Sequence, residues 1–127
     1  MNTNCCTFIQ GAMASLDGKI DMSFLHNYCA TLMRRKEMVV QTIADDEMLE
    51  MVSPLSGFFA FINISRTGLS SNEFCSLLME STGVAITPGI AFGENWDDHV
   101  RLSYATKDDT LSAGLAGVQE FAQSINK

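Results

Sequence analysis

The sequence predicts an α+β fold in which a small, mostly antiparallel sheet of three to four strands packs against helices. Segments with apolar residues at every third or fourth position indicate amphipathic helices, and shorter apolar or alternating segments between them indicate strands. The expected order is helix, helix, strand, strand, helix, strand, strand, helix, which lacks the regular alternation of a parallel sheet. A length of 127 residues suits one domain.

Two helices are expected first. Residues 5–16 are apolar on nearly every side and end at the turn signal Asp17-Gly18, which predicts a short helix. Residues 21–43 carry apolar side chains at steps of three, four or seven, interleaved with charged residues, and predict one long amphipathic helix. Its apolar positions are Leu25, Tyr28, Leu32, Val39 and Ile43.

Two strands and a third helix are expected next. A short strand is predicted over residues 48–52, before Pro54. Residues 57–64 (GFFAFINI) are almost continuously apolar, as in a strand that is covered on both faces. Ser70 and Glu73 then have the spacing of a capping box, which predicts a helix that ends at Gly83. We expect its buried face to hold Phe74, Leu77 and Leu78.

The last part of the chain predicts two more strands and a fourth helix. Residues 84–87 form a brief strand that Pro88-Gly89 ends, and residues 99–104 alternate between apolar and polar side chains. Residues 106–109 would cap the final helix. Its apolar stripe is expected to consist of Leu111, Leu115, Val118, Ala122 and Ile125.

The composition narrows the class of protein. A net charge of -7 argues against a nucleic-acid or acidic-membrane surface, because both require clustered Lys and Arg. No apolar run approaches the ~18 residues of a membrane span. The four cysteines and two histidines match no metal-site spacing. We therefore expect a cytoplasmic protein with reduced cysteines and no metal, nucleic-acid or membrane partner.

Arg101 is the one charged residue in the alternating strand. Val100, Leu102 and Tyr104 should share one face of that strand, so that Arg101 lies on the other. An arginine there either belongs to a solvated face or recognises an anion, because a guanidinium pairs bidentately with carboxylates. The alternation alone leaves both possibilities open.

Three segments together resemble the C-terminal domain of the class I and II aminotransferases, the fold-type I pyridoxal-phosphate enzymes related to aspartate aminotransferase. Residues 54–61 (PLSGFFAF) are similar to the family's Pro-x-Gly-x-Phe-Tyr strand, with one extra residue between Pro and Gly. Residues 83–93 (GVAITPGIAFG) and 100–105 (VRLSYA) resemble its Gly-Val-x-x-x-Pro-Gly-x-x-Phe-Gly and Arg-Leu-Ser-Tyr-Ala segments. The resemblance covers essentially the whole chain.

The resemblance implies a role in amino-acid metabolism. Residues 1–127 would be the small C-terminal domain of a transferase that moves an amino group between an amino acid and a 2-oxo acid. Arg101 would bind the substrate α-carboxylate, and Phe92 would line the pocket or pack in the core. The helix within residues 1–18 would pack on a large domain or a second subunit, so that the chain by itself should dimerise or associate through exposed apolar helices.

The cofactor site is implied to lie elsewhere. The family's Schiff-base lysine, in a Ser-Lys setting, and its cradle for pyridoxal 5'-phosphate belong to the upstream large domain. The lysines in this sequence are Lys19, Lys36, Lys107 and Lys127, and none has that setting. We therefore expect a truncated domain that binds no pyridoxal phosphate and does not transaminate alone.

An alternative function is a freestanding anion-binding or protein-interaction module without catalysis. Residues 66–68 precede Ser70 and Ser71 at a predicted helix start, where free amides can hold a phosphate. Ordinary helix capping explains the same serines.

Overall fold

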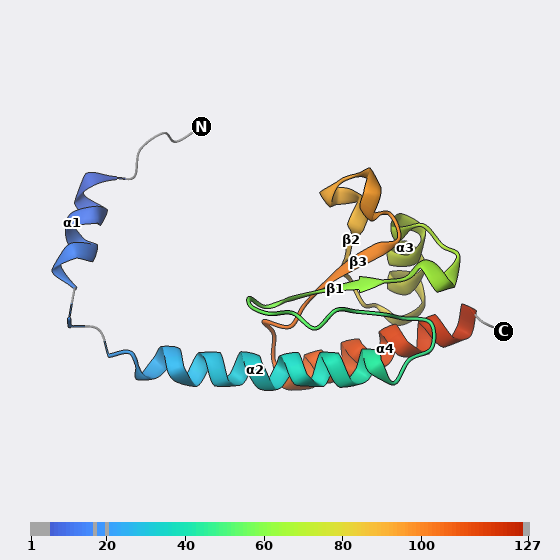
Figure 1. Ribbon diagram of the computed structural model, residues 1–127, viewed down its shortest axis with the longest axis horizontal. Coiled ribbons are helices and arrows are strands. Elements are labelled where there is room, and N and C mark those ends of the chain that lie inside the picture. The colour runs from blue at the N-terminus through green and yellow to red at the C-terminus, as the bar shows by residue number, and fades with distance from the viewer. Residues whose placement is uncertain (1–5, 17, 20, 126–127) are drawn as a thin grey trace. The chain divides into compact units, whose positions relative to one another are not determined.

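The computed structural model describes residues 6–16, 18–19 and 21–125, which form two compact units, Met1–Ala30 and Thr31–Lys127 (Figure 1). The first unit holds α1 (Thr7–Ser15) and the beginning of α2 (Ser23–Ala44). Both expected N-terminal helices are thereby confirmed, although Cys5 and Asp17 lie outside the described residues. No residue of α1 is buried, and its apolar side chains Phe8, Ile9 and Met13 are largely exposed.

The second unit is built around a three-stranded antiparallel sheet. The strands are β1 (Phe59–Asn63), β2 (Thr87–Pro88) and β3 (His99–Ser103), in the order β1-β3-β2. Two further helices, α3 (Ser71–Thr82) and α4 (Asp108–Ile125), complete the unit. The predicted α+β class is therefore confirmed, with three strands in the sheet.

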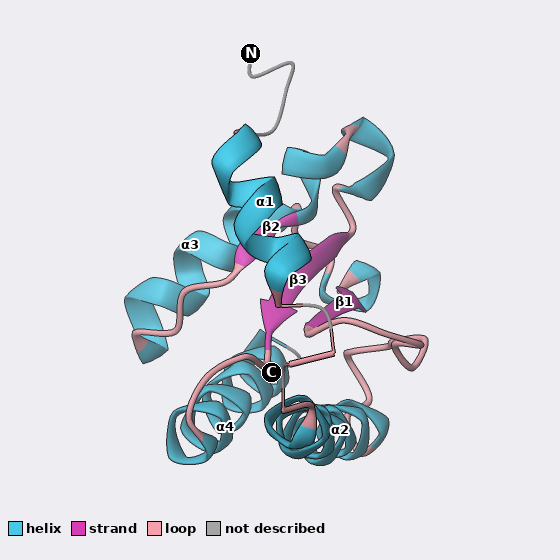
Figure 2. Ribbon diagram, turned by 90° about the vertical axis from the view of Figure 1, so that its left-hand side faces the viewer, coloured by secondary structure: helices cyan, strands magenta, loops and turns pink. Residues whose placement is uncertain are grey.

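Helices cover one face of this sheet. Figure 2 shows α2 and α4 side by side, and the amide nitrogen of Gln119 donates to the carbonyl of Thr42 at 2.9 Å between them. Phe74 of α3 meets Phe121 of α4 edge to face, with 5.0 Å between ring centroids. The core between sheet and helices contains Val39, Ile43, Ala60, Ile62, Ile64, Phe74, Leu78, Val100, Leu102, Tyr104, Leu111, Leu115, Val118 and Ala122.

The prediction that β1 is covered on both faces was wrong. Ala60 and Ile62 are fully buried, whereas the alternate residue Phe59 remains 40% exposed. Because the α-helices of the second unit pack on one side only, the second face of β1 carries aromatic rings that meet Phe92 and Trp96 of two short 3-10 helices instead. Leu77, predicted to be buried, is 43% exposed, while Phe74 and Leu78 are the apolar residues of the buried stripe of α3.

A strand over residues 48–52 was also predicted and does not form. Only Glu50 bridges to Asn63. The carboxylate of Asp46 accepts the backbone N–H groups of Met48 at 2.8 Å and Leu49 at 3.2 Å, which removes those donors from a ladder. Pro54, which has no N–H, then follows the bridge. Of the strand expected over residues 84–87, only Thr87 pairs with another strand. The pairing then continues through Pro88, which was expected to end the strand.

The predicted capping box is present at the start of α3. The Ser70 hydroxyl accepts the Glu73 N–H at 3.4 Å, and the Glu73 carboxylate accepts the Ser70 N–H at 3.0 Å. The Ser70 hydroxyl also donates to the Glu73 carboxylate at 2.6 Å, and this bond, followed by the one from the Ser70 N–H, lowers the pKa of Glu73. Gly83 ends the helix with a φ of 75°, a left-handed conformation that favours glycine.

Candidate functional site

Arg101 occupies the centre of the sheet, on the face opposite to the helices. It lies in the middle of the central strand β3, directly across from Phe61 of β1 and Thr87 of β2. Its neighbours Val100 and Leu102 point into the core. The expected alternation therefore places the Arg101 side chain on the face that carries the aromatic rings of β1.

The guanidinium of Arg101 lies between two aromatic rings. Its Cζ is 4.3 Å from the centroid of the Phe59 ring and 4.8 Å from the centroid of the Phe92 ring. Both distances fall within the range of cation–π contacts. The two rings come from opposite sides of β3, Phe59 from β1 and Phe92 from the segment that follows β2.

The hydrogen-bonding capacity of Arg101 is largely unused. Nη2 donates to the Thr87 hydroxyl at 3.3 Å, and Nε is buried without a partner. The other three arginines, Arg34, Arg35 and Arg66, all pair with carboxylates within the described part of the chain, whereas Arg101 pairs with none there. A guanidinium carries five donors, so this cation retains the capacity to bind an anion.

An aromatic cluster continues along the same face. Phe61 meets Phe92 and Trp96 edge to face, with centroids 5.9 and 5.2 Å away, and stacks on His99 at 4.9 Å. His99 Nδ1 lies 2.5 Å from the Asp98 carboxylate, and Nε2 lies 3.5 Å from the Asn63 amide nitrogen. A neutral imidazole with its proton on Nδ1 satisfies both contacts.

The segment after Pro88 brings Phe92 and Trp96 over the sheet. It consists of two short 3-10 helices, Gly89–Phe92 (η2) and Glu94–Trp96 (η3). A Cβ at Gly89 would lie 2.0 Å from the Trp96 carbonyl oxygen and 2.4 Å from that of His99. Only glycine therefore allows the segment to fold back so closely onto its own end.

The structure brings together the two residues that the sequence singled out, Arg101 and Phe92. Phe59 and Thr87, which also contact the guanidinium, were missed. The alternation along β1 places Phe59 and Phe61 on one face, but the pairing register with β3 sets Phe61 directly across from Arg101, and the guanidinium extends diagonally over Phe59. That register joins residues about forty positions apart, so the local pattern did not contain it.

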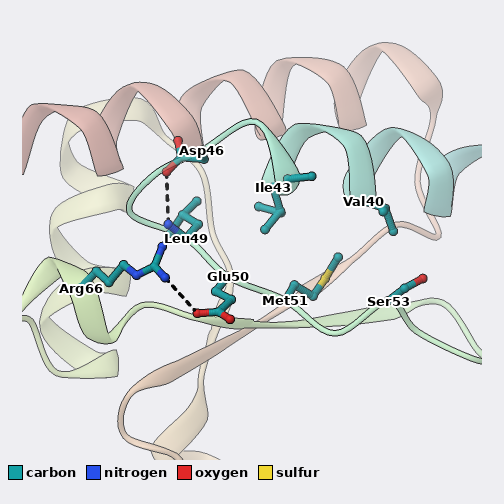
Figure 3. Close-up of a pocket in the computed structure, with 9 residues that line it drawn as sticks. Val40, Ile43, Asp46, Leu49, Glu50, Met51, Ser53 and Arg66 are labelled. Carbon is teal, nitrogen blue, oxygen red and sulfur yellow. Dashed lines mark hydrogen bonds and ion pairs between the residues drawn. The ribbon is translucent and has the colours of Figure 1, made fainter.

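At the alternative anion site, residues 66–68 with Ser70 and Ser71, the polar side chains already bond to other groups of the protein. Arg66 donates to the Glu47 carbonyl at 3.0 Å and pairs with Glu50 at 3.3 Å. Figure 3 shows Arg66 and Glu50 at the edge of a pocket of about 330 Å³ that also involves the end of α2. Ser70 caps its own helix, and the Ser71 hydroxyl donates to Asp97 at 2.7 Å. These contacts engage the groups that a phosphate would need.

The described residues contain neither a metal-binding cluster nor a membrane-spanning helix. Among residues 6–16, 18–19 and 21–125, no three His, Cys, Asp or Glu side chains gather as they would around a metal ion. No helix in that part of the chain combines the length and apolarity that crossing a bilayer requires.

The comparisons with known proteins agree on one family. Residues 2–117 match the family model for aminotransferase class I and II. The aromatic-amino-acid aminotransferase 2 of Thermococcus litoralis is 35% identical over 117 residues, which are 90% of this chain and 30% of that protein. The aspartate aminotransferase of Pyrococcus horikoshii is 34% identical over 86 residues, covering 68% of this chain and 22% of that protein.

Solved structures show the same similarity. The aspartate aminotransferase of Rhizobium meliloti superposes with a TM-score of 0.81 at 25% identity, covering 95% of this chain and 32% of that one. The aromatic aminotransferase of Pyrococcus horikoshii gives a TM-score of 0.79 at 28% identity, covering 85% of this chain and 29% of that one. The chain thus spans under a third of these relatives' length. Taken with the match to the family model, these similarities show that the chain belongs to the class I and II aminotransferase family.

Proposed function

We propose that this chain is the C-terminal small domain of a pyridoxal-phosphate-dependent aminotransferase, and that Arg101 binds the α-carboxylate of its substrates. The reaction moves an amino group between an amino acid and a 2-oxo acid. Family membership supports the reaction class. The observation that carries the role of Arg101 is its guanidinium, which is held between Phe59 and Phe92 without a carboxylate partner among the described residues.

The surroundings of Arg101 suit a carboxylate ligand. A carboxylate accepts two parallel hydrogen bonds from a guanidinium, and such charge-assisted pairs are stronger than neutral hydrogen bonds. The rings of Phe59 and Phe92 exclude water from the guanidinium faces, which strengthens an ion pair formed at its edge. Because Nε is buried, the carboxylate approaches the Nη1 and Nη2 end of the fork.

Phe92 serves two purposes in this proposal. Its ring stacks on the guanidinium at 4.8 Å, and 46% of its surface remains exposed. The exposed part walls the position that the substrate takes beside Arg101. Both interpretations of Phe92, packing and contact with substrate, therefore apply to different parts of one ring.

The residues around Arg101 do not fit pyridoxal phosphate. Aromatic rings and the Thr87 hydroxyl surround the guanidinium, and no lysine is among its contacts in the described part of the chain. We propose that the cofactor is held by parts of the parent enzyme beyond this chain, that this chain alone does not transaminate, and that the protein acts in the cytoplasm as a homodimer. No step of the reaction is assigned to residues of this chain beyond binding of the substrate.

The experiment compares kcat/KM for amino acids between variants of an aminotransferase that contains this chain. Arg101→Gln should reduce kcat/KM for amino acids by at least about 30-fold, because loss of one partner from a buried charged pair costs roughly 2–5 kcal/mol. Arg66→Gln is the matched control, since Arg66 already pairs with Glu50. Equal kcat/KM values for the two variants would contradict the proposed role of Arg101.

A further inference from the structure

Ser71 anchors the segment that carries Phe92. It is the first residue of α3 and is fully buried. Its hydroxyl donates to Asp97 Oδ1 at 2.7 Å and accepts the Ile90 N–H at 3.2 Å. Its own N–H meets both the Asp97 carbonyl oxygen at 2.7 Å and Asp97 Oδ1 at 3.1 Å. One serine is therefore bonded to two points of the chain that lie seven residues apart.

These two points bracket the aromatic residues of the site. Ile90 precedes Phe92 by two residues, and Asp97 follows Trp96 directly. The Ile64 N–H bonds the Asp98 carbonyl oxygen at 2.8 Å, which ties the end of the same segment to the end of β1. The close approach at Gly89 completes a loop that is closed at its base and presents Phe92 over β3.

Helix capping does not account for the hydrogen bonds of the Ser71 hydroxyl. The N-cap of α3 is Ser70, which forms the capping box with Glu73. Ser71 lies one position later, where no side-chain cap is required. Its hydroxyl and the Asp97 carboxylate instead form a tertiary link between α3 and the segment over the sheet.

We propose that Ser71 and Asp97 are positioning residues for Arg101. They hold residues 89–98 so that Phe92 stays stacked on the guanidinium, which keeps Nε dry and points the Nη end of the fork toward the substrate position. The inference rests on the proposed carboxylate role of Arg101. It adds that the orientation of the guanidinium depends on the hydrogen bond between Ser71 at the start of α3 and Asp97. Neither Ser71 nor Asp97 touches the guanidinium.

Loss of the link has a defined consequence. Without the hydroxyl, the Ile90 N–H loses its partner and Asp97 Oδ1 keeps only the Ser71 N–H, so fewer bonds close the loop at its base. Phe92 then leaves the guanidinium for part of the time, and Arg101 samples more rotamers. Fixing one long side chain on binding lowers affinity by roughly 2- to 10-fold, so we expect a loss of that size in carboxylate affinity.

The test uses the 127-residue chain and the NMR signal of the Arg101 Nε–H group. In the unmodified chain this proton should be shifted by the two rings and should exchange slowly with water, because it is buried. Ser71→Ala and Asp97→Ala should move the signal toward the position of a solvated arginine and accelerate its exchange. Asp97→Asn retains an oxygen that accepts from Ser71 and should preserve the signal.

Ser70→Ala is the matched control for helix stability. It removes the neighbouring hydroxyl and weakens the same helix start, but it leaves the link to Asp97 in place. An Arg101 Nε–H signal that is unchanged in folded Ser71→Ala and Asp97→Ala, or that shifts equally in Ser70→Ala, would overturn the proposal. If Ser71→Ala does not fold, the pair Asp97→Ala and Asp97→Asn decides the question alone.

Titration with 3-phenylpropanoate separates this inference from the proposed function. If the ligand binds, affinity should fall about 2- to 10-fold in Ser71→Ala and Asp97→Ala and recover in Asp97→Asn. Unchanged affinity in both alanine variants would overturn the positioning role even when Arg101 binds the ligand. If no carboxylate binds the unmodified chain, the proposed function fails, whereas the Nε–H signal still tests whether Ser71 and Asp97 orient Arg101.

Discussion

The guanidinium of Arg101 lies over the Phe92 ring, with 4.8 Å between Cζ and the ring centroid, and also over the Phe59 ring at 4.3 Å. Arg101 has no carboxylate partner among the described residues. Contact with the two rings allows this unpaired cation to lie in a partly buried position. Each ring also limits the directions from which an anion can approach. The contact between Phe92 and Arg101 thus links the fold of the segment after Pro88 to the chemistry of the sheet face.

The cation–π contact between Phe59 and Arg101 should stabilise the fold independently of Phe92. Phe59→Leu removes the aromatic face but keeps an apolar side chain on β1. We expect a reduction in stability of about 0.5–2 kcal/mol, because a partly desolvated cation–π contact is lost. Urea denaturation measures this change, and Phe58→Leu serves as the control because the Phe58 ring lies against Phe59, 4.5 Å between centroids, and not over the guanidinium. A smaller loss for Phe59→Leu than for the control would contradict the role of the stack.

Gly89 should tolerate no side chain. A Cβ there would lie 2.0 Å from a backbone carbonyl oxygen, which cannot move without displacing the loop. Gly89→Ala should therefore lower the free energy of unfolding by more than about 3 kcal/mol. Gly114→Ala is the control, because nothing lies within 4 Å of its Cβ position in α4, and it should raise stability by up to ~1 kcal/mol. Urea denaturation of both variants measures the difference, and similar values would be inconsistent with the close approach.

Asp108 should make the fold sensitive to acid. Hydrogen bonds from Arg35 and then Arg34 lower the pKa of this carboxyl. Because the pKa is lower in the folded state, its stabilising contribution is present above the unfolded pKa, roughly 4, and is lost as the pH falls through the folded value. Asp108→Asn should be less stable than the unmodified chain at pH 7, and the difference should shrink at a pH below the unfolded pKa of roughly 4.

Asp109→Asn provides the control for this measurement. Asp109 also lies in the first turn of α4, so the interaction with the helix dipole is matched, but it has no ion pair within the described residues. Denaturation at both pH values should show the pH-dependent loss only for Asp108→Asn. Identical pH profiles for the two variants would rule out the ion pairs as its source.

The apolar helices of the first unit should drive association. Phe8, Met13 and Phe24 are 77%, 61% and 60% exposed, and such surfaces are rarely left open in a monomer. Light scattering should therefore give a mass above the 13.9 kDa of one chain. Phe8→Glu with Met13→Glu should restore the mass of a single chain. A mass of one chain before these substitutions would contradict the prediction.

The sequence predicted those elements whose signal is local. The Ser70 and Glu73 capping box, the Gly83 end of α3 and the alternation around Arg101 all depend on residues a few positions apart, and the structure has each of them. The contacts that define the site depend on strand register instead. The register of β1 against β3 places Phe61 directly across from Arg101, and the guanidinium reaches diagonally to the ring of Phe59.

The wrong predictions have the same physical origin. A continuous apolar run in β1 indicated burial on both faces, although the second unit supplies α-helices for one face only, and Phe59 on the other face remains 40% exposed. The strand expected over residues 48–52 was prevented by a side chain, since Asp46 takes the amides that a ladder would use. Neither the number of covering layers nor a competing side-chain bond is visible in hydrophobic periodicity.

Binding of a carboxylate to the 127-residue chain tests the central claim most directly. We expect 3-phenylpropanoate to shift the Arg101 guanidinium signals in an NMR titration, whereas the neutral 3-phenylpropanamide, which has the same shape, should not. Arg101→Gln should abolish binding, and Arg66→Gln should leave it intact. Equal binding of the acid and the amide, or undiminished binding to Arg101→Gln, would contradict the assignment of Arg101 as the carboxylate ligand.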